Sequence, residues 1–317
     1  MGRRGLRVCG WVAGVVLVGL GLVGAGRYAW TFWRYRGFAP PSAPVAVTDR
    51  SGRAVAVGSA TVESLSVPSP SLGGRSDPVL VVLPPGYADS PGRRYPSVYL
   101  LHGVPGRPSD FVSIGDLATT EATLVAAGQL RPAIYVIPSG SPSLLADEEW
   151  ANGIRAGNDW ESFVAGDLVG YVDSHFRTIP AGSARAIAGL SEGGYGALNI
   201  GLHHPGEFRV LESWSGYMTA EDITSVFGHD RARLAYNSPA MTVRRQAGAI
   251  RADHLFIWFY CGRQDYTVAG NEAFAAELAG LGLPYRFQIV PGAHNWKLWR
   301  TMMAPALMVA SSRAGGG

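Results

Sequence analysis

The chain has 317 residues, 47% hydrophobic and 16% charged, so it is long enough to bury one large core or two modest ones. This balance is typical of a packed globular protein with an apolar excess that a membrane segment would explain, and a net charge of +3 is too small to indicate nucleic-acid binding. The two cysteines, Cys9 and Cys261, cannot form a disulfide framework, and we expect both to be free. No zinc-type spacing of Cys and His is present, and no cofactor or metal is implied.

The chain begins with a segment typical of a membrane anchor or an export signal. Residues 8–26 carry no charge, follow a cluster of arginines and would span about 28 Å as a helix, close to the thickness of a bilayer core. The aromatic and basic run at 27–36 suits a membrane interface. An uncleaved anchor over 1–36 is favoured over a cleaved signal, because the apolar stretch is longer than that of most signal peptides. We therefore expect a single-pass protein of the cell membrane with the rest of the chain outside the cytoplasm, the alternative being a secreted protein.

After a Pro- and Gly-containing linker at 37–58, strand patterns alternate with helix patterns. Strands are predicted at 61–67, 79–83, 97–101, 133–137, 208–214, 255–260 and 285–290, and helices at 117–127, 160–176 and 272–280. This alternation predicts an α/β fold over 59–312, with a mostly parallel central sheet and helices on both faces, followed by a flexible tail at 313–317. In such sheets, functional residues lie in the loops after the carboxyl ends of the strands.

The most informative motif lies within residues 186–196. Gly189-Leu190-Ser191-Glu192-Gly193 fits G-x-S-x-G, and it stands between an apolar strand-like run and a helical run that Pro205 ends. A strand, a sharp turn and a helix are the context of a nucleophile elbow, in which the serine hydroxyl stands exposed above the sheet. The pentapeptide alone is weak evidence in a chain with 42 glycines. Its flanking strand and helix make Ser191 the candidate nucleophile.

Two further candidate residues follow the ends of later predicted strands. The order Ser191, then Asp265, then His294 is the order of a triad in α/β-hydrolases. The histidine would accept the serine proton and return it to the leaving group, while the aspartate would hold the histidine tautomer. Taken singly, Asp265 could be a turn cap, His294 could be an ordinary loop residue, and Glu272 is a rival acid. Three such residues at strand ends favour the triad.

An oxyanion hole should combine the N–H after the nucleophile with one from the loop after an early strand. The first donor would be Glu192. The loop His102-Gly103-Val104-Pro105 is the natural source of the second, and Val104 is our candidate because proline has no N–H. We expect His102 to shape this loop and to take no part in proton transfer.

Further motifs are spread over residues 59–312. They are Val-Leu-Pro-Pro-Gly-Tyr at 82–87, Leu-Leu-His-Gly at 100–103, Trp-Glu-Ser-Phe at 160–163, Ala-Gly-Leu-Ser at 188–191, His-Pro-Gly-Glu-Phe at 204–208, Tyr-Cys-Gly at 260–262 and His-Asn-Trp at 294–296, with Trp299 following. With these motifs the chain resembles the esterase D group of α/β-hydrolases, which includes mycolyltransferases, feruloyl esterases, enterochelin esterases and S-formylglutathione hydrolase. The resemblance implies the α/β-hydrolase fold, with Ser191 as nucleophile, His294 as base, and Val104 and Glu192 as oxyanion donors.

Within this group, the Trp-Glu-Ser-Phe and Tyr-Cys-Gly motifs look most like the mycolyltransferases. The chain departs from that branch at His102-Gly103, where the branch has Asp-Gly. It departs again at Asp265, because the acid of the branch is a glutamate farther past the Tyr-Cys-Gly motif. These departures weaken the transferase interpretation and strengthen the esterase one.

Two segments, 139–158 and 215–245, are long enough to form a roof over a binding pocket. A lid that selects the acyl or alcohol group and an ordinary loop with core packing are equally good interpretations. The acidic run Asp147-Glu148-Glu149 lacks the ligand pattern of a calcium site.

The sequence therefore predicts a serine esterase that hydrolyses a carboxylic ester through an acyl-enzyme, outside the cytoplasmic membrane. The substrate would be a small-molecule, lipid or glycan ester. The alternative is an acyltransferase that moves the acyl group to a cell-envelope alcohol or sugar on the same triad. A third, less favoured hypothesis is a catalytically silent binding module on the same fold.

Overall fold

The computed structural model describes residues 60–141, 148–220 and 224–315. Within these residues, no helix combines the length and the apolar character that crossing a membrane requires. The predicted anchor at 8–26 and the linker at 37–58 lie outside the described residues.

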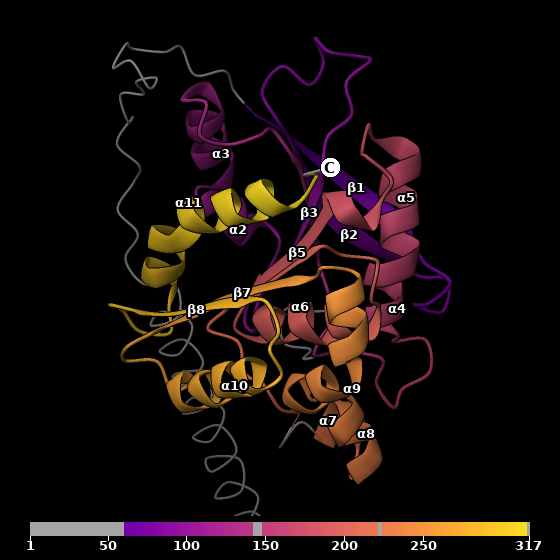
Figure 1. Cartoon of the computed structure of the whole chain (residues 1–317). Helices are drawn as coiled ribbons and strands as arrows, with labels where there is room; N and C mark the ends of the chain where they lie inside the picture. The colour runs from indigo at the N-terminus through magenta and orange to yellow at the C-terminus, as the bar shows by residue number, and fades with distance from the viewer. Residues whose placement is uncertain (1–59, 142–147, 221–223, 316–317) are drawn as a thin grey trace, which may run out of the picture.

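The described residues form one eight-stranded sheet in the order β1-β2-β4-β3-β5-β6-β7-β8 (Figure 1). The strands are β1 (Thr61–Pro68), β2 (Ser76–Leu83), β3 (Ser97–Leu101), β4 (Ile134–Pro138), β5 (Arg185–Leu190), β6 (Val210–Trp214), β7 (Phe256–Gly262) and β8 (Tyr285–Val290). β1 and β2 form an antiparallel edge, and the strands from β4 to β8 run parallel to one another. The predicted α/β-hydrolase type of sheet is therefore observed, and the predicted strands agree with it to within a few residues.

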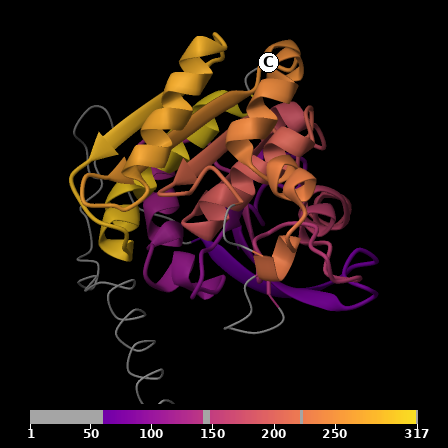
Figure 2. The same ribbon diagram turned by 90° about the horizontal axis from the view of Figure 1, so that it is seen from below.

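Helices cover both faces of the sheet, as the view in Figure 2 shows. They are α2 (Ser109–Ser113), α3 (Leu117–Ala126), α4 (Trp160–Ser162), α5 (Val169–His175), α6 (Glu192–His203), α7 (Thr224–Phe227), α8 (Arg231–Tyr236), α9 (Pro239–Ala252), α10 (Val268–Gly280) and α11 (Trp296–Arg313). β3 illustrates the two cores: Tyr99 and Leu101 pack with α5, α6, α9 and α10, whereas Val98 and Leu100 pack with α2, α3 and α11. Successive side chains of a strand point to opposite faces, so a strand covered on both faces is apolar throughout.

The helix predicted at 160–176 is present but is not a regular α-helix. A π-helical segment, Phe163–Leu168, separates α4 from α5. Asn158, with Glu161 three residues later, fits a capping pattern in the sequence, and this predicts that Asn158 caps the helix. The prediction is wrong, because Asp159 is the N-cap residue and no side chain caps the helix. The side chain of Asn158 donates to the Glu148 carboxylate instead, at 3.4 Å. A long-range contact has taken the side chain that the local pattern assigned to the cap.

The C-terminus is more ordered than the sequence predicted. α11 runs to Arg313 with Pro305 inside it, and a proline there hides the helix from pattern analysis. The prediction of a flexible tail at 313–317 does not hold for residues 313–315. Ala314 is buried, and Gly315 donates to the Ser183 carbonyl at 2.8 Å and accepts from Arg131 at 2.5 Å. Residues 316–317 lie outside the described part of the chain.

Glu121 on α3 gives the fold a pH dependence that can be tested. Its Oε1 accepts from the Ala133 N–H at 3.3 Å, while Oε2 is buried with no partner among the described residues. Burial raises the pKa of Glu121 from 4.5 to about 8, and the hydrogen bond from Ala133 offsets only part of this. Between these two values the folded protein keeps a proton that the unfolded chain has lost, so the free energy of unfolding falls as the pH rises.

Glu121→Gln keeps the acceptor oxygen and cannot ionise, so the variant should lose this pH dependence. Relative to the wild type, we expect the variant to be more stable at about pH 9 than at about pH 5. The difference between their free energies of unfolding should change by up to a few kcal/mol, at about 1.4 kcal/mol for each unit by which the pKa is shifted. Denaturant unfolding at both pH values would measure the change. A stability difference that is the same at both pH values would contradict the prediction.

Candidate active site

The turn between β5 and α6 places Ser191 in a strained conformation at the carboxyl edge of the sheet. Its φ is 55° and its ψ is −123°, and its N–H donates to the Trp214 carbonyl at 2.9 Å. The two glycines of the motif are required by contact. A Cβ on Gly189 would lie 2.2 Å from the Gly193 carbonyl oxygen, and one on Gly193 would lie 2.0 Å from the Leu101 oxygen. Real Cβ atoms do not approach backbone so closely, so only glycine fits at both positions.

The structure brings Ser191, His294 and Asp265 together in one chain of hydrogen bonds. The Ser191 Oγ lies 2.8 Å from the His294 Nε2, and the His294 Nδ1 lies 3.0 Å from each carboxylate oxygen of Asp265. With Nδ1–H donating to the carboxylate, Nε2 carries the lone pair that accepts the serine proton. The residues come from the loops after β5, β7 and β8, parallel strands whose carboxyl ends meet at one edge of the sheet.

The carboxylate of Asp265 is held in its charged form although it is buried. Burial raises the pKa of Asp265, but the hydrogen bond and charge of His294, with bonds from Ser215 and Thr267, outweigh it and leave the pKa below its usual value. The N–H and hydroxyl of Thr267 both donate to Oδ1, at 3.0 and 2.9 Å. Glu272, the rival acid of the sequence analysis, is exposed on α10. Of the two carboxylates, Asp265 is therefore the one that bonds His294.

Two aromatic side chains contact the His294 ring. Tyr266 lies with its ring centroid 4.7 Å away, and Trp299 meets the ring edge-on at 5.1 Å. The Trp299 indole donates to the Ser215 hydroxyl at 3.3 Å, and Ser215 also bonds Asp265. Tyr266 is 74% exposed and reaches Ser191 with its hydroxyl. Tyr266 is not part of any motif noted in the sequence, although its place directly after Asp265 was a signal that it lies at the site.

The two predicted oxyanion donors lie on elements that touch each other. Glu192 is the first residue of α6, and the first N–H groups of a helix have no partner within it. Val104 lies in the loop after β3, which pairs with β5. The contact is direct, because a Cβ on Gly193 would lie 2.7 Å from the His102 carbonyl oxygen. The loop with Val104 therefore begins against the first turn of α6.

His102 shapes this loop through its backbone neighbours. Its Nε2 lies 2.6 Å from the Ser139 carbonyl oxygen, and its Nδ1 lies 3.0 Å from that of Gly103. Burial lowers the pKa of His102, which favours the neutral ring. Trp150 holds the same residue from its other end, because its indole N–H donates to the His102 carbonyl at 3.0 Å. In the sequence, Trp150 is only one residue of a predicted loop, and no local pattern indicates its hydrogen bond to His102.

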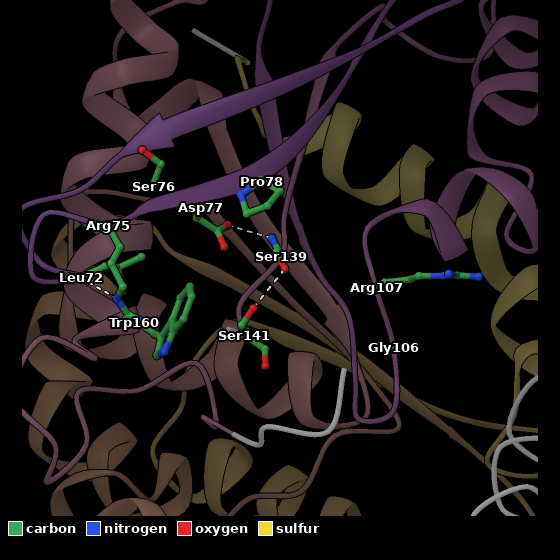
Figure 3. A pocket seen from close by; sticks show the side chains of 10 residues that line it. All are labelled: Leu72, Arg75, Ser76, Asp77, Pro78, Gly106, Arg107, Ser139, Ser141 and Trp160. Carbon is green, nitrogen blue, oxygen red and sulfur yellow. Dashed lines mark hydrogen bonds between the residues drawn. The ribbon is translucent and has the colours of Figure 1, made fainter. Parts of the chain in front are cut away.

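Two cavities have lining residues close to this region in the chain. One, of about 360 Å³, is bordered by Tyr217, Met218, Tyr266 and Phe274, beside α9 and α10. The other, of about 610 Å³, lies beside β2 and the loop after β3. Figure 3 shows the Asp77 carboxylate of this second cavity turned toward the Ser139 N–H, which donates to it at 2.8 Å. Charged and hydroxyl groups border both cavities, since Arg244, Glu277 and Thr267 also line the first.

Among the residues that the structure describes, no group of three His, Cys, Asp or Glu side chains is placed to hold a metal ion. Cys261 is a buried free cysteine at the end of β7. Burial, with smaller contributions from the charges of Asp265 and Glu272, raises the pKa of the Cys261 thiol to about 12. A thiol with so high a pKa is a poor nucleophile, so Cys261 does not compete with Ser191. Cys9 lies outside the described residues.

Comparison with known proteins identifies esterases and acyltransferases as relatives. The esterase family model, described as "Putative esterase", matches residues 69–309. Esterase Rv1288 of Mycobacterium tuberculosis is 27% identical over 251 residues, which cover 69% of this chain and 52% of that protein. The chain thus spans about half the length of this relative. The diacylglycerol acyltransferase/mycolyltransferase Ag85A of Mycobacterium leprae is 28% identical over 282 residues, covering 75% of this chain and 79% of that one.

A solved structure of a ferulic acid esterase superposes with a TM-score of 0.71 at 23% identity, covering 81% of this chain and all of that one. At this identity the likeness establishes the fold, which is the α/β-hydrolase arrangement described above. The family match covers most of the chain and includes the strand ends that carry Ser191, Asp265 and His294. The chain belongs to this esterase family.

Proposed function

We propose that the protein is a serine esterase that hydrolyses a carboxylic ester through an acyl-enzyme formed on Ser191. The observation that carries this proposal is the chain of hydrogen bonds from Ser191 through His294 to Asp265. His294 Nε2 accepts the proton as the Ser191 oxygen attacks the ester carbonyl, and Asp265 stabilises the imidazolium that forms. His294 then protonates the leaving alcohol. In the second half-reaction it takes a proton from water, which attacks the acyl-enzyme.

The N–H groups of Glu192 and Val104 bind the negative charge that develops on the carbonyl oxygen. The N-terminus of α6 adds a favourable dipole at the same place. The cavity beside Tyr266, at about 360 Å³, is of a size typical of small-ligand sites, and its side chains Met218 and Phe274 suit an apolar acyl group. We propose this cavity as the acyl side of the site.

A second candidate function is acyl transfer to an alcohol or sugar. Its support is the similarity to the Ag85A protein, whose name describes an acyltransferase, over three quarters of this chain. Both functions use the same triad and differ in whether water or another hydroxyl attacks the acyl-enzyme. The position of Asp265, a few residues past β7, is the reason that we place hydrolysis first.

Ser191→Ala should abolish catalysis, because no other group in the site can form the acyl-enzyme. We expect the wild type to release free acid from p-nitrophenyl esters and the variant to be slower on the order of 10⁴-fold or more. The wild type should also react with a fluorophosphonate, and the variant should not. Acyl transfer to an added sugar in preference to water would support the second function. A wild type that is inert to both reagents would leave the binding-module hypothesis standing.

The choice of acid is tested by a matched pair of variants. Asp265→Asn should lower kcat on the order of 10³- to 10⁴-fold, because an amide cannot stabilise the imidazolium or fix its tautomer. Glu272→Gln changes an exposed carboxylate on α10 in the same way and should leave kcat within about twofold. The reverse order of effects would refute the assignment of Asp265.

We also propose that the domain acts outside the cytoplasmic membrane. The support is the order of basic residues followed by the uncharged stretch 8–26. A membrane-impermeant fluorophosphonate added to intact cells should then label Ser191. Labelling that needs cell lysis would contradict this location.

A further inference from the structure

Trp150 joins three parts of the proposed active site and is itself only 1% exposed. Its indole N–H donates to the carbonyl of His102, the residue that opens the loop carrying Val104. Its ring meets the imidazole of His102 edge-on, with centroids 5.3 Å apart. The other end of His102 is held as well, since its Nε2 lies 2.6 Å from the Ser139 carbonyl. The start of the loop is thus fixed by both its carbonyl and its side chain.

Two glycines far apart in the sequence leave the space that Trp150 fills. A Cβ on Gly140, in the loop after β4, would lie 2.0 Å from the far edge of the indole. A Cβ on Gly196, in the first turns of α6, would lie 2.6 Å from the Trp150 Cβ. The indole therefore lies directly against the helix that follows the nucleophile and against the loop that holds His102. Either glycine replaced by a larger residue would displace it.

The backbone at this position is strained. Glu149 and Trp150 have φ values of 54° and 51°, a conformation that residues with side chains rarely adopt. Strained residues persist only where surrounding contacts determine them, and they gather at functional sites. Here Glu149 is buried and accepts a hydrogen bond from the Tyr217 hydroxyl, and the Ala151 N–H donates to the Glu148 carbonyl at 3.2 Å. The contacts of this segment hold Trp150 in place against the strain.

We propose that Trp150 is a positioning residue for the oxyanion hole. By holding the His102 carbonyl, it fixes the plane of the peptide that leads into Gly103. The His102 ring that it packs against fixes the next peptide, which carries the Val104 N–H and sets its direction, because Nδ1 lies 3.0 Å from the Gly103 oxygen. Gly103 is the reason that an anchor from outside the loop is needed, because glycine leaves the backbone free to rotate. The contact of Trp150 with Gly196 relates this direction to α6, which carries the other donor, Glu192. The inference rests on the proposed esterase function.

A residue with this role acts on the transition state more than on the bound ester. The oxyanion donors gain their full strength only when charge has developed on the carbonyl oxygen. Loss of the Trp150 N–H should therefore lower kcat and leave KM little changed. If Trp150 were purely structural, its replacement would lower the melting temperature and would change kcat no more than other core substitutions do.

The test uses two variants of the full-length protein and a matched control. Trp150→Phe removes the indole N–H together with some volume, and β-(3-benzothienyl)alanine at position 150 replaces the N–H with sulfur at nearly the same volume. Trp160→Phe is the control, because Trp160 is equally buried and its indole N–H has no hydrogen-bond partner among the described residues. For both Trp150 variants we expect kcat for p-nitrophenyl esters to fall about 10-fold, less than the 10²- to 10³-fold typical of losing an oxyanion donor outright. The control should stay within about twofold of the wild type.

Inhibition by an alkyl trifluoromethyl ketone gives an independent measurement. Its tetrahedral adduct on Ser191 needs the oxyanion hole, so its affinity should fall in parallel with kcat, whereas inhibition by the free product acid should not change. If the benzothienyl variant keeps the wild-type kcat and ketone affinity, the proposal is wrong, whatever Trp150→Phe does. If the wild type is inactive, or if Ser191→Ala retains its activity, the proposed function fails instead, so the two failures are distinct.

Discussion

The geometry of the site depends on the sharp turn at Ser191. The parallel strand β5 ends at this turn, and α6 runs back from it across one face of the sheet, so the chain must reverse its direction within a single residue. The positive φ of Ser191 is the result, at a cost of about 1–3 kcal/mol for such a conformation. The cost is met by close backbone contacts on both sides, which only Gly189 and Gly193 permit. The same contacts bring the loop after β3 against the first turn of α6, so one local constraint aligns the nucleophile with both proposed oxyanion donors.

The electrostatics of the triad follow from what surrounds Asp265. A buried carboxylate loses hydration, and this alone would raise its pKa and favour the neutral form. Donors from Thr267, Ser215 and His294 replace the lost water, so the pKa of Asp265 lies below its usual value. Glu121 shows the opposite case, since a single hydrogen bond leaves its pKa at about 8. The difference between the two acids lies in the number of donors and the neighbouring charge, and it decides which of them is ionised at neutral pH.

The sequence was sufficient for those parts of the site that are set by local chain geometry. Ser191, Asp265 and His294 each follow a buried strand, and parallel strands bring such positions to one edge, so their meeting could be predicted from three separate stretches. Trp150 could not be found in this way. Its partners, Gly140, His102 and Gly196, are on three different elements, and the interaction exists only once these have packed. α11 was missed for a related reason, because burial of one helix face outweighs the helix-breaking tendency of Pro305.

The approach to His294 bears on the choice between hydrolysis and transfer. An acyltransferase must keep water from the acyl-enzyme for as long as the acceptor takes to arrive, and closed sites achieve this by excluding solvent. Here the imidazole of His294 retains 14% exposure, and the ring that covers it, Tyr266, is 74% exposed. Solvent therefore reaches part of the His294 side chain. An acceptor alcohol would have to compete with this solvent, and the exposure is one reason that we place hydrolysis before transfer in the proposed function.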